Sequence, residues 1–355
     1  MSTVLVLVLG TEVHIDYLQA KQQKQQVSTG DVSNKMIIPG GMPIGIYMKA
    51  DGILVLGTDY IEGMDGKKYN PASEVVKAGD YIIQINGTET NSKTQLLNEV
   101  KRLNSAEVVL KLRRNGNEIE TKLNAIMTKD KTYKLGIWVR DSIQGLGTIT
   151  YITEDNKFGA LGHGIHDVDT GELLEMSDGK IYDTQIVNVK KGEKGSPGGL
   201  EGMIVYSNYS VWGTIEKNTD IGVYGTVKKV NEVTDGEITI PVCTKRAVKV
   251  GPAIIRCCID DEVKEYDIEI IKVNYFTLTE NKALVIEVVD EKLLEETGGI
   301  VQGMSGSPII QNGKLVGAVT HVLVNDPTRG YGIFIENMLE TANQVAEEQA
   351  KKDAS

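Results

Sequence analysis

This 355-residue sequence has few large aromatic side chains, with three phenylalanines and two tryptophans, and it has only four histidines. The apolar run Val4–Leu9 is far shorter than the roughly 20 residues that span a bilayer. It also lacks the basic start and the small-residue cleavage site of a secretory signal. We expect either a lone strand there or the remnant of a longer anchor, so that any targeting segment is short or truncated.

Cysteine is also scarce, with three residues at positions Cys243, Cys257 and Cys258. An odd number of cysteines without a spacing pattern argues against a disulfide scaffold and against a zinc site. Adjacent cysteines rarely bridge each other without strain. We therefore expect the three thiols to be small buried apolar groups.

Positive charge is in deficit, because the formal net charge is −11 at pH 7. This deficit argues against nucleic acid as a partner, since binding to phosphates needs a basic surface. The chain is long enough for two domains of ordinary size, and its 41% of hydrophobic residues is typical of a soluble globular protein. Its 38 glycines, together with many Val, Ile and Thr, favour short strands joined by tight turns.

The first third of the sequence predicts a polar leader and a small α+β domain. Residues 1–35 are rich in glutamine and read as an N-terminal segment and linker. Residues 36–128 alternate between strand patterns and one helical pattern, in which Leu96, Leu97, Val100 and Leu103 share a face. The dipeptide Asn115-Gly116 between alternating residues predicts a hairpin with a type I′ turn.

Residues 134–345 predict an all-β domain. Short apolar segments there are separated by Gly, Asn and Asp, and no helical pattern occurs until residues 337–352. Many short strands with little helix favour an antiparallel barrel or sandwich.

The sharpest motif is Gly303–Pro308 (GMSGSP), which precedes an apolar run. A nucleophilic serine needs a tight turn with small neighbours and backbone N–H groups that face the developing oxyanion. Gly303 and Gly306 permit the backbone conformations of such a turn. We therefore expect Ser305 to be a nucleophile and the N–H groups of Gly303 and Ser305 to form an oxyanion hole.

The second motif is Gly159–Ile165 (GALGHGI), which places His163 between two glycines after an apolar segment. Histidine is the natural general base near neutral pH, so its pairing with Ser305 favours catalysis over a structural role. We expect His166 to be a surface residue and His321 to have a packing role in the strand after the serine, and we assign His14 no role.

Together these motifs give the chain a specific resemblance. GALGHGIHDVDTG and TGGIVQGMSGSPIIQNGKLVGAVTHVLVNDPTRGYGIFIENML resemble the stage IV sporulation protein B peptidases, over roughly residues 36–340. That resemblance implies a mainly β fold in which an N-terminal PDZ domain is followed by a chymotrypsin-like double β-barrel peptidase domain. AGDYIIQING resembles the core signature of PDZ domains, and IPGGMPIGIYM resembles the family's carboxylate-binding loop.

The resemblance assigns His163 as the base and Ser305 as the nucleophile of a serine endopeptidase. The family pattern places the acid of the triad at Asp290, whereas ordinary chymotrypsin-like spacing would place it near Asp220. We favour Asp290. Either carboxylate would orient the imidazole and stabilise its charged form.

The resemblance also implies partners and a location. A PDZ domain binds a peptide as an added strand whose terminal carboxylate is held by backbone N–H groups, here those of Ile44, Gly45 and Ile46. The natural ligand could be another protein or the chain's own N-terminal segment. The resemblance implies that the enzyme cleaves a membrane-bound regulatory complex and thereby activates sigma-factor processing. It also implies self-cleavage near the N terminus. The expected location is extracytoplasmic, with the protein secreted into the forespore intermembrane space or tethered to a membrane there. It implies no metal or organic cofactor. The alternative is a catalytically silent PDZ scaffold that binds peptides on a protease-like fold.

Overall fold

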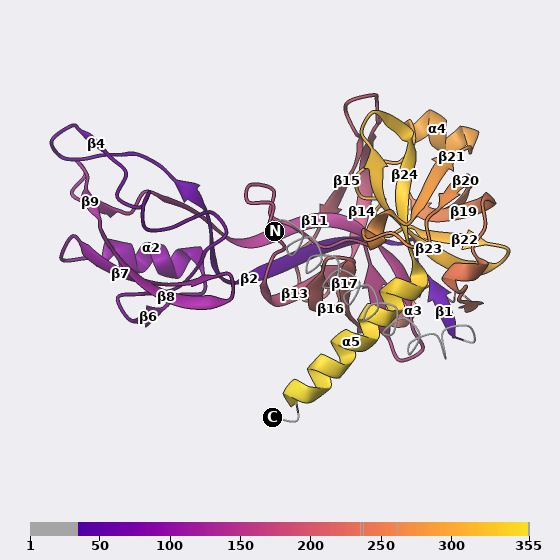
Figure 1. Ribbon diagram of the computed structural model, residues 1–355, viewed down its shortest axis with the longest axis horizontal. Helices are drawn as coiled ribbons and strands as arrows, with labels where there is room; N and C mark the ends of the chain where they lie inside the picture. The colour runs from indigo at the N-terminus through magenta and orange to yellow at the C-terminus, as the bar shows by residue number, and fades with distance from the viewer. Residues whose placement is uncertain (1–34, 235, 237, 261, 354–355) are drawn as a thin grey trace, which may run out of the picture.

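The structure is a computed structural model that describes residues 35–353 except 235, 237 and 261. The expectations for the N-terminal segment therefore lie outside the described residues, apart from Lys35. Figure 1 shows a small domain and a larger body, which are joined by a ribbon of two long strands. These strands are β2 (Pro43–Thr58) and β11 (Ile137–Ile152).

The first barrel is built on the inner halves of these two long strands. Its other strands are β12 (Lys157–Ala160), β13 (Met176–Tyr182), β16 (Val211–Thr219) and β17 (Gly222–Val227). The antiparallel order β11-β12-β17-β16-β13-β2 closes on itself because β2 also pairs with β11. Strands β1 (Met36–Pro39) and β18 (Ile240–Pro241) extend this sheet beside β11. Ile44, Ile46 and Ile149 fill the interior of the barrel and are fully buried or nearly so.

The small domain lies at the outer ends of the two long strands. Its elements are β3 (Ile61–Glu62), β4 (Lys68–Tyr69), β5 (Tyr81–Ile85), β6 (Thr88–Glu89), α2 (Lys93–Lys101), β7 (Glu107–Arg114), β8 (Asn117–Asn124), β9 (Ile126–Met127) and β10 (Tyr133–Lys134). Its core is separate from that of the barrel and includes Ile53, Ile82 and Leu110. Helix α2 begins where Ser92 accepts a hydrogen bond from the backbone N–H of Gln95. The chain thus contains the α+β domain that the sequence predicts.

The hairpin predicted at Asn115-Gly116 is present between β7 and β8. Both turn residues have positive φ angles, of 50° and 74°, as a type I′ turn requires. The predicted helix is also present, but it is shorter than its apolar pattern and ends before Leu103.

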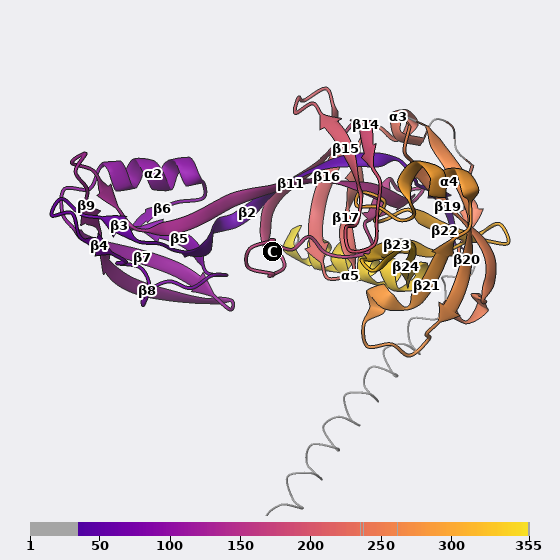
Figure 2. The same cartoon turned by 90° about the horizontal axis from the view of Figure 1, so that it is seen from above.

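The division between the two domains differs from the predicted one. Residues 36–50 were expected in the small domain but lie in the first barrel, where β2 pairs with β11 on one side and with β13 on the other. The small domain is therefore inserted into a barrel hairpin (Figure 2). The reason is that β2 is one continuous strand, whose inner half buries Ile44 and Ile46 in the barrel and whose outer half buries Ile53 and Val55 in the small domain.

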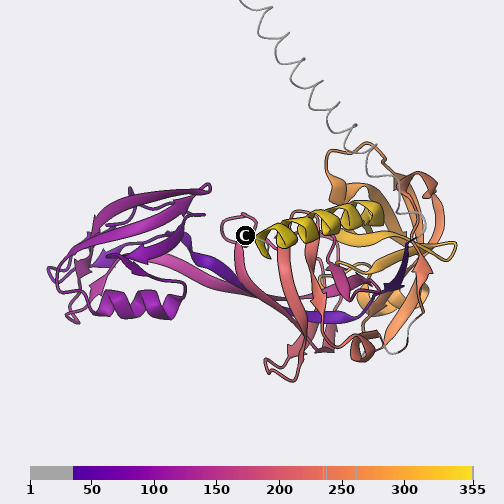
Figure 3. The ribbon, with the colours of Figure 1, turned by 90° about the horizontal axis from the view of Figure 1, so that it is seen from below.

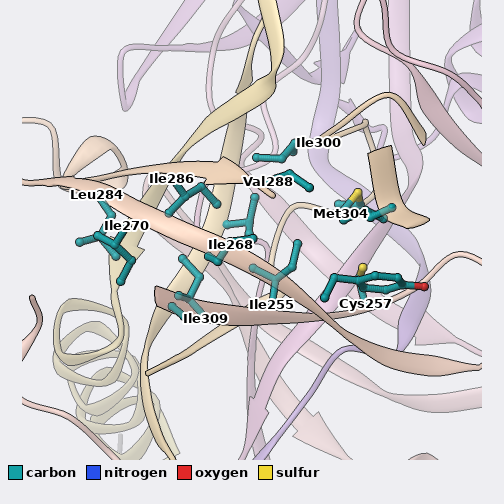
Figure 4. Packing of buried hydrophobic residues seen from close by; sticks show 14 of the residues in the cluster. Ile255, Cys257, Ile268, Ile270, Leu284, Ile286, Val288, Ile300, Met304 and Ile309 are labelled. Carbon is teal, nitrogen blue, oxygen red and sulfur yellow. The ribbon is translucent and has the colours of Figure 1, made fainter. Parts of the chain in front are cut away.

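The second barrel is formed by β19 (Gly251–Cys258), β20 (Val263–Val273), β21 (Leu284–Val288), β22 (Pro308–Gln311), β23 (Lys314–Leu323) and β24 (Asp326–Phe334), which close in the order β19-β20-β21-β24-β23-β22. Ile255, Ile268 and Ile286 from three of these strands meet in its core (Figure 4). All three cysteines are buried, and they form no disulfide. Two closed barrels together with a small α+β domain confirm the predicted fold class.

The remaining elements cover the barrels. They are β14 (Thr184–Lys190), β15 (Gly199–Ile204), α3 (Val230–Thr234), η2 (Lys245–Ala247), η3 (Glu280–Lys282), α4 (Glu291–Thr297) and α5 (Ile335–Asp353). Helix α5 packs on β12 and β17 of the first barrel and on β23 and β24 of the second, so it bridges both (Figure 3). Within the described part of the chain, α5 and the other helices are too short or too polar to cross a membrane.

Candidate active site

The predicted nucleophile lies in a tight loop just before β22. Gly303 and Gly306 have φ angles of 99° and 97°, a region that favours glycine. The backbone N–H of Gly306 donates to Val319 O on β23, which ties the loop to the second barrel. Met304 between them is fully buried and points into the barrel core (Figure 4). The loop is therefore anchored from below by Met304, while Ser305 lies on its outer side.

Ser305 lines a cavity between the two barrels. The first barrel contributes Ile46 and Leu146 to its wall, and the second contributes Val322. The hydroxyl of Ser305 donates to Thr320 O at 2.8 Å. Within the described part of the chain, the backbone N–H groups of Gly303 and Ser305 have no hydrogen-bond acceptor. These two donors are thus available to a ligand oxygen.

His163 lines the same cavity from the first barrel. It follows β12 through a sharp turn in which Leu161 and Gly162 both have positive φ angles, of 69° and 67°. Its Nδ1 lies 2.8 Å from the carbonyl oxygen of Gly164. Because a carbonyl oxygen can only accept a hydrogen bond, Nδ1 carries the hydrogen and donates it. The other ring nitrogen is then the unprotonated one in the neutral imidazole. Burial lowers the pKa of His163, so the ring is neutral at neutral pH.

Two further histidines lie beside His163. The ring of His321 packs against that of His163 with a centroid separation of 4.9 Å, and His321 also lines the cavity. Burial is the main cause that lowers the pKa of His321, to about 4. The sequence predicts only a packing role for His321 in its strand. A strand pattern does not show which of its side chains border a cavity, so this position becomes visible only in the structure. His166 lines the cavity as well, and its side chain is 42% exposed.

Neither candidate for the triad acid contacts the ring of His163. Asp290 is the N-cap of α4, where its Oδ1 accepts from the backbone N–H of Leu293 at 2.9 Å. It does not line the cavity. Asp220 lies closer to the histidine loop, since its carbonyl oxygen accepts from the N–H of Gly164, but its carboxylate faces His166 at 3.8 Å. The structure therefore brings His163, Ser305 and Gly303 together and leaves both carboxylates outside that group.

The N-cap position of Asp290 gives a testable expectation. Asp290→Ala should lower the free energy of unfolding by about 1 kcal/mol, because it removes the capping oxygen of α4. Asp290→Asn keeps a capping oxygen and removes only the charge, so we expect it to retain both stability and peptidase activity. Thermal unfolding and turnover of a protein substrate measure the two effects. A loss of more than about a thousandfold in kcat for a stable Asp290→Asn protein would instead assign Asp290 as the triad acid.

The predicted carboxylate-binding loop is not a loop. Ile44, Gly45 and Ile46 lie inside β2, where all three pair with β11 on one side and Gly45 and Ile46 also pair with β13 on the other. A Cβ at Gly45 would lie 2.6 Å from Thr184 Oγ1 and 2.7 Å from the side chain of Ile204, so that face of the strand is closely packed. The prediction of these three residues as a peptide-binding loop is wrong, because the pattern of small and apolar residues belongs to a strand of the barrel.

The corresponding edge of β2 in the small domain is also covered. Residues 137–140 at the start of β11 pair with Leu54–Thr58 of β2. Ile137 and Val139 pack against the core of the small domain, and the backbone N–H of Lys93 at the start of α2 donates to Asp141. The edge between β2 and α2 is thus occupied by the chain itself.

No group of three or more metal-ligating side chains occurs in the described ranges. The groups that the cavity presents include the hydroxyl of Ser305, the imidazoles of His163, His166 and His321, and the backbone N–H groups of Gly303 and Ser305.

Comparisons with known proteins find a matching family and several similar solved structures. The family described as SpoIVB peptidase S55 matches residues 131–339. Among solved structures, the chain is similar to the PDZ domain of an SdrC-like protein from Listeria monocytogenes, at 20% identity over 25% of this chain and 87% of that one, with a TM-score of 0.21. It is also similar to a protease of M. tuberculosis in its active form, at 10% identity over 57% of this chain and 73% of that one, with a TM-score of 0.33. A third is the HtrA-type protease AlgW with a tripeptide, at 12% identity over 58% of this chain and 57% of that one, with a TM-score of 0.35.

Because these three scores are low, the fold assignment rests on the strand pairings described above. The family match, by contrast, includes both the histidine and the serine motifs and extends over more than half of the chain. The chain therefore belongs to the SpoIVB peptidase family and is a serine peptidase.

Proposed function

We propose that this chain is a serine endopeptidase in which Ser305 is the nucleophile, His163 is the general base and the N–H groups of Gly303 and Ser305 form the oxyanion hole. The observation that carries the proposal is the cavity between the barrels. It is lined by His163, Gly303 and Ser305, and both backbone donors lack a partner among the described residues.

The reaction follows from the positions of the protons. The bond from His163 Nδ1–H to Gly164 O leaves Nε2 with its lone pair. Ser305 must first turn its hydroxyl away from Thr320 O. Its oxygen then attacks the scissile carbonyl while Nε2 takes the hydroxyl proton, and the oxyanion is held by the two N–H groups. The imidazolium next gives its proton to the leaving amine, and water attacks the acyl-enzyme in the same way.

The residues that line the cavity favour a substrate with an uncharged side chain next to the scissile bond. Ile143, Ile300 and Val322 belong to it, and it includes no Lys, Arg, Asp or Glu among its described residues. A buried charge without a partner is costly, so such a site disfavours a charged side chain. We propose that the enzyme prefers substrates with an apolar residue at this position.

The biological setting is proposed from the family. We infer that the enzyme cleaves an extracytoplasmic part of a membrane-bound regulatory protein in sporulation signalling, in the space between the forespore membranes. Self-cleavage in the glutamine-rich N-terminal segment is part of the same proposal. The PDZ-like domain would take up a peptide by strand addition, and such a peptide would have to replace residues 137–140 on β2.

The test uses the purified full chain, a fluorophosphonate probe and an unfolded protein substrate. We expect the probe to label the wild type at Ser305, and we expect Ser305→Ala to lose both labelling and cleavage, by at least about a thousandfold. Ser307→Ala is the matched control, because Ser307 lies in the same loop, is fully buried and has a hydroxyl without a partner among the described residues.

The outcomes separate enzyme from scaffold. Intact mass over time shows whether the wild type shortens its own N-terminal region while Ser305→Ala does not. A wild type that is neither labelled nor active would favour the peptide-binding scaffold. Activity that persists in Ser305→Ala would mean that another residue is the nucleophile.

A further inference from the structure

We infer that Thr148 is a positioning residue that holds the two catalytic loops in register with each other. This inference rests on the proposed function, because it assigns Thr148 a role in shaping the site of Ser305 and His163. Thr148 lies on β11 of the first barrel and is 2% exposed. It is not one of the residues that line the cavity, so it acts through the loops and does not touch the substrate.

Three polar groups of Thr148 contact the catalytic loops. Its backbone N–H donates to Ser305 O at 3.0 Å, and its hydroxyl donates to Gly303 O at 2.8 Å. Its carbonyl oxygen accepts from the N–H of Leu161 at 3.3 Å, two residues before His163. One residue therefore joins the serine loop of the second barrel to the histidine loop of the first.

The two bonds to the serine loop fix the direction of its peptide planes. Because a peptide unit is planar, holding Gly303 O and Ser305 O also holds the N–H groups of Met304 and Gly306. The amides of Gly303 and Ser305 belong to the adjoining peptide units and have no acceptor among the described residues, as an oxyanion hole requires. If the hydroxyl of Thr148 were lost, Gly303 O would lose this partner and the peptide plane could rotate.

The fit between the strand and the loop is close. A Cβ on Gly306 would lie only 2.1 Å from Thr148 O. The serine loop thus lies directly on the backbone of β11. A small movement of the loop would be enough to break the bond from the hydroxyl to Gly303 O.

The experiment compares three variants of the full chain. Thr148→Val has nearly the same shape but no hydroxyl, and we expect its kcat to fall by about ten- to a hundredfold, as for a buried carbonyl that loses its partner. We expect KM to stay within about twofold, because Thr148 does not line the cavity. Thr148→Ser keeps the hydroxyl and should recover most of the activity.

Thr150→Val is the matched control. Thr150 lies on the same strand, is fully buried, and has a hydroxyl without a hydrogen-bond partner among the described residues. The rate of labelling of Ser305 by a fluorophosphonate should therefore fall in Thr148→Val and stay at the wild-type value in Thr150→Val. Amide hydrogen exchange of the segment 301–307 should rise only in Thr148→Val.

The inference is overturned if Thr148→Val and Thr150→Val have the same kcat and the same exchange in the serine loop. It is also overturned if Thr148→Ser loses as much activity as Thr148→Val, since the hydroxyl would then be irrelevant. A wild type without labelling or cleavage would contradict the proposed function instead. In that case the hydrogen-exchange comparison still decides whether Thr148 holds the loop.

Discussion

Gly306→Ala is expected to abolish labelling of Ser305 and to lower peptidase activity by at least about a thousandfold. The added Cβ would lie 2.1 Å from Thr148 O and 2.6 Å from Leu161 N, and both of these are backbone atoms that cannot turn away. The φ angle of 97° adds conformational strain for any residue with a side chain. The serine loop must therefore move away from β11, and the cost in stability is several kcal/mol, about the range of overpacked cores.

Gly313→Ala is the control for this substitution. Gly313 also has a positive φ angle, of 71°, but a Cβ there would meet nothing within 4 Å. It should cost only about 1 kcal/mol through backbone strain and leave activity unchanged. Melting temperature and the rate of fluorophosphonate labelling measure both variants. Equal labelling of the two variants would show that the loop tolerates displacement from β11, and that this contact does not control the site.

His163→Gln should lower kcat by about a hundred- to ten-thousandfold, because it removes the group that accepts the proton of Ser305. Glutamine keeps a polar side chain of similar size, so we expect the fold to be retained, and circular dichroism checks this. His166→Gln is the comparison, since His166 lines the same cavity but hydrogen-bonds only to the backbone of Gly164 among the described residues. Its effect on kcat at neutral pH should be within a few fold. Comparable losses in both variants would contradict the assignment of His163 as the base.

The pH dependence of kcat/KM gives a second measure of the same residue. His163 accepts a proton only when it is neutral, so activity is lost as the pH falls through its pKa. Burial lowers that pKa from its ordinary value of 6.5, and a nearby positive charge on His166 lowers it further. The acid limb should therefore have its midpoint below pH 6.5, and His166→Gln should shift the midpoint upward. A midpoint above about pH 7 would instead indicate a carboxylate against the ring, as in a complete triad.

Local patterns were sufficient for much of the fold. The strand patterns, the turn at Asn115-Gly116 and the final helix depend on neighbouring residues, and the structure contains all three. The place of residues 36–50 was not predictable in this way. Ile44 and Ile46 are apolar positions that suit a strand in either domain, and only pairing with the distant strand β11 decides which.

The candidate site shows the same limit. The motifs around His163 and Ser305 are short and contain the glycines that their turns need, so the sequence was enough to find them. The surroundings of Thr148 are different, since a hydroxyl that bonds to a loop of the other barrel has no local pattern. The capping role of Asp290 is local, but its distance from the cavity depends on the fold. Threonine in a strand is ordinary, and nothing at position 148 distinguishes it from Thr150 until the partner strands and loops are in place.

The ribbon formed by β2 and β11 has a consequence for how the small domain is attached. The chain leaves the first barrel and returns to it through two paired strands, and Lys49 lies directly opposite Ser142. The small domain is thus inserted at the tip of a hairpin of the first barrel. A short turn from Lys49 to Ser142 would connect the two barrel strands without it. A pull on the small domain along the ribbon would draw β2 and β11 outward together, so the load would fall on the pairs that join β2 to β13 and β11 to β12. Strand β11 thus connects the attachment of the small domain directly to Thr148, the residue that hydrogen-bonds to the serine loop.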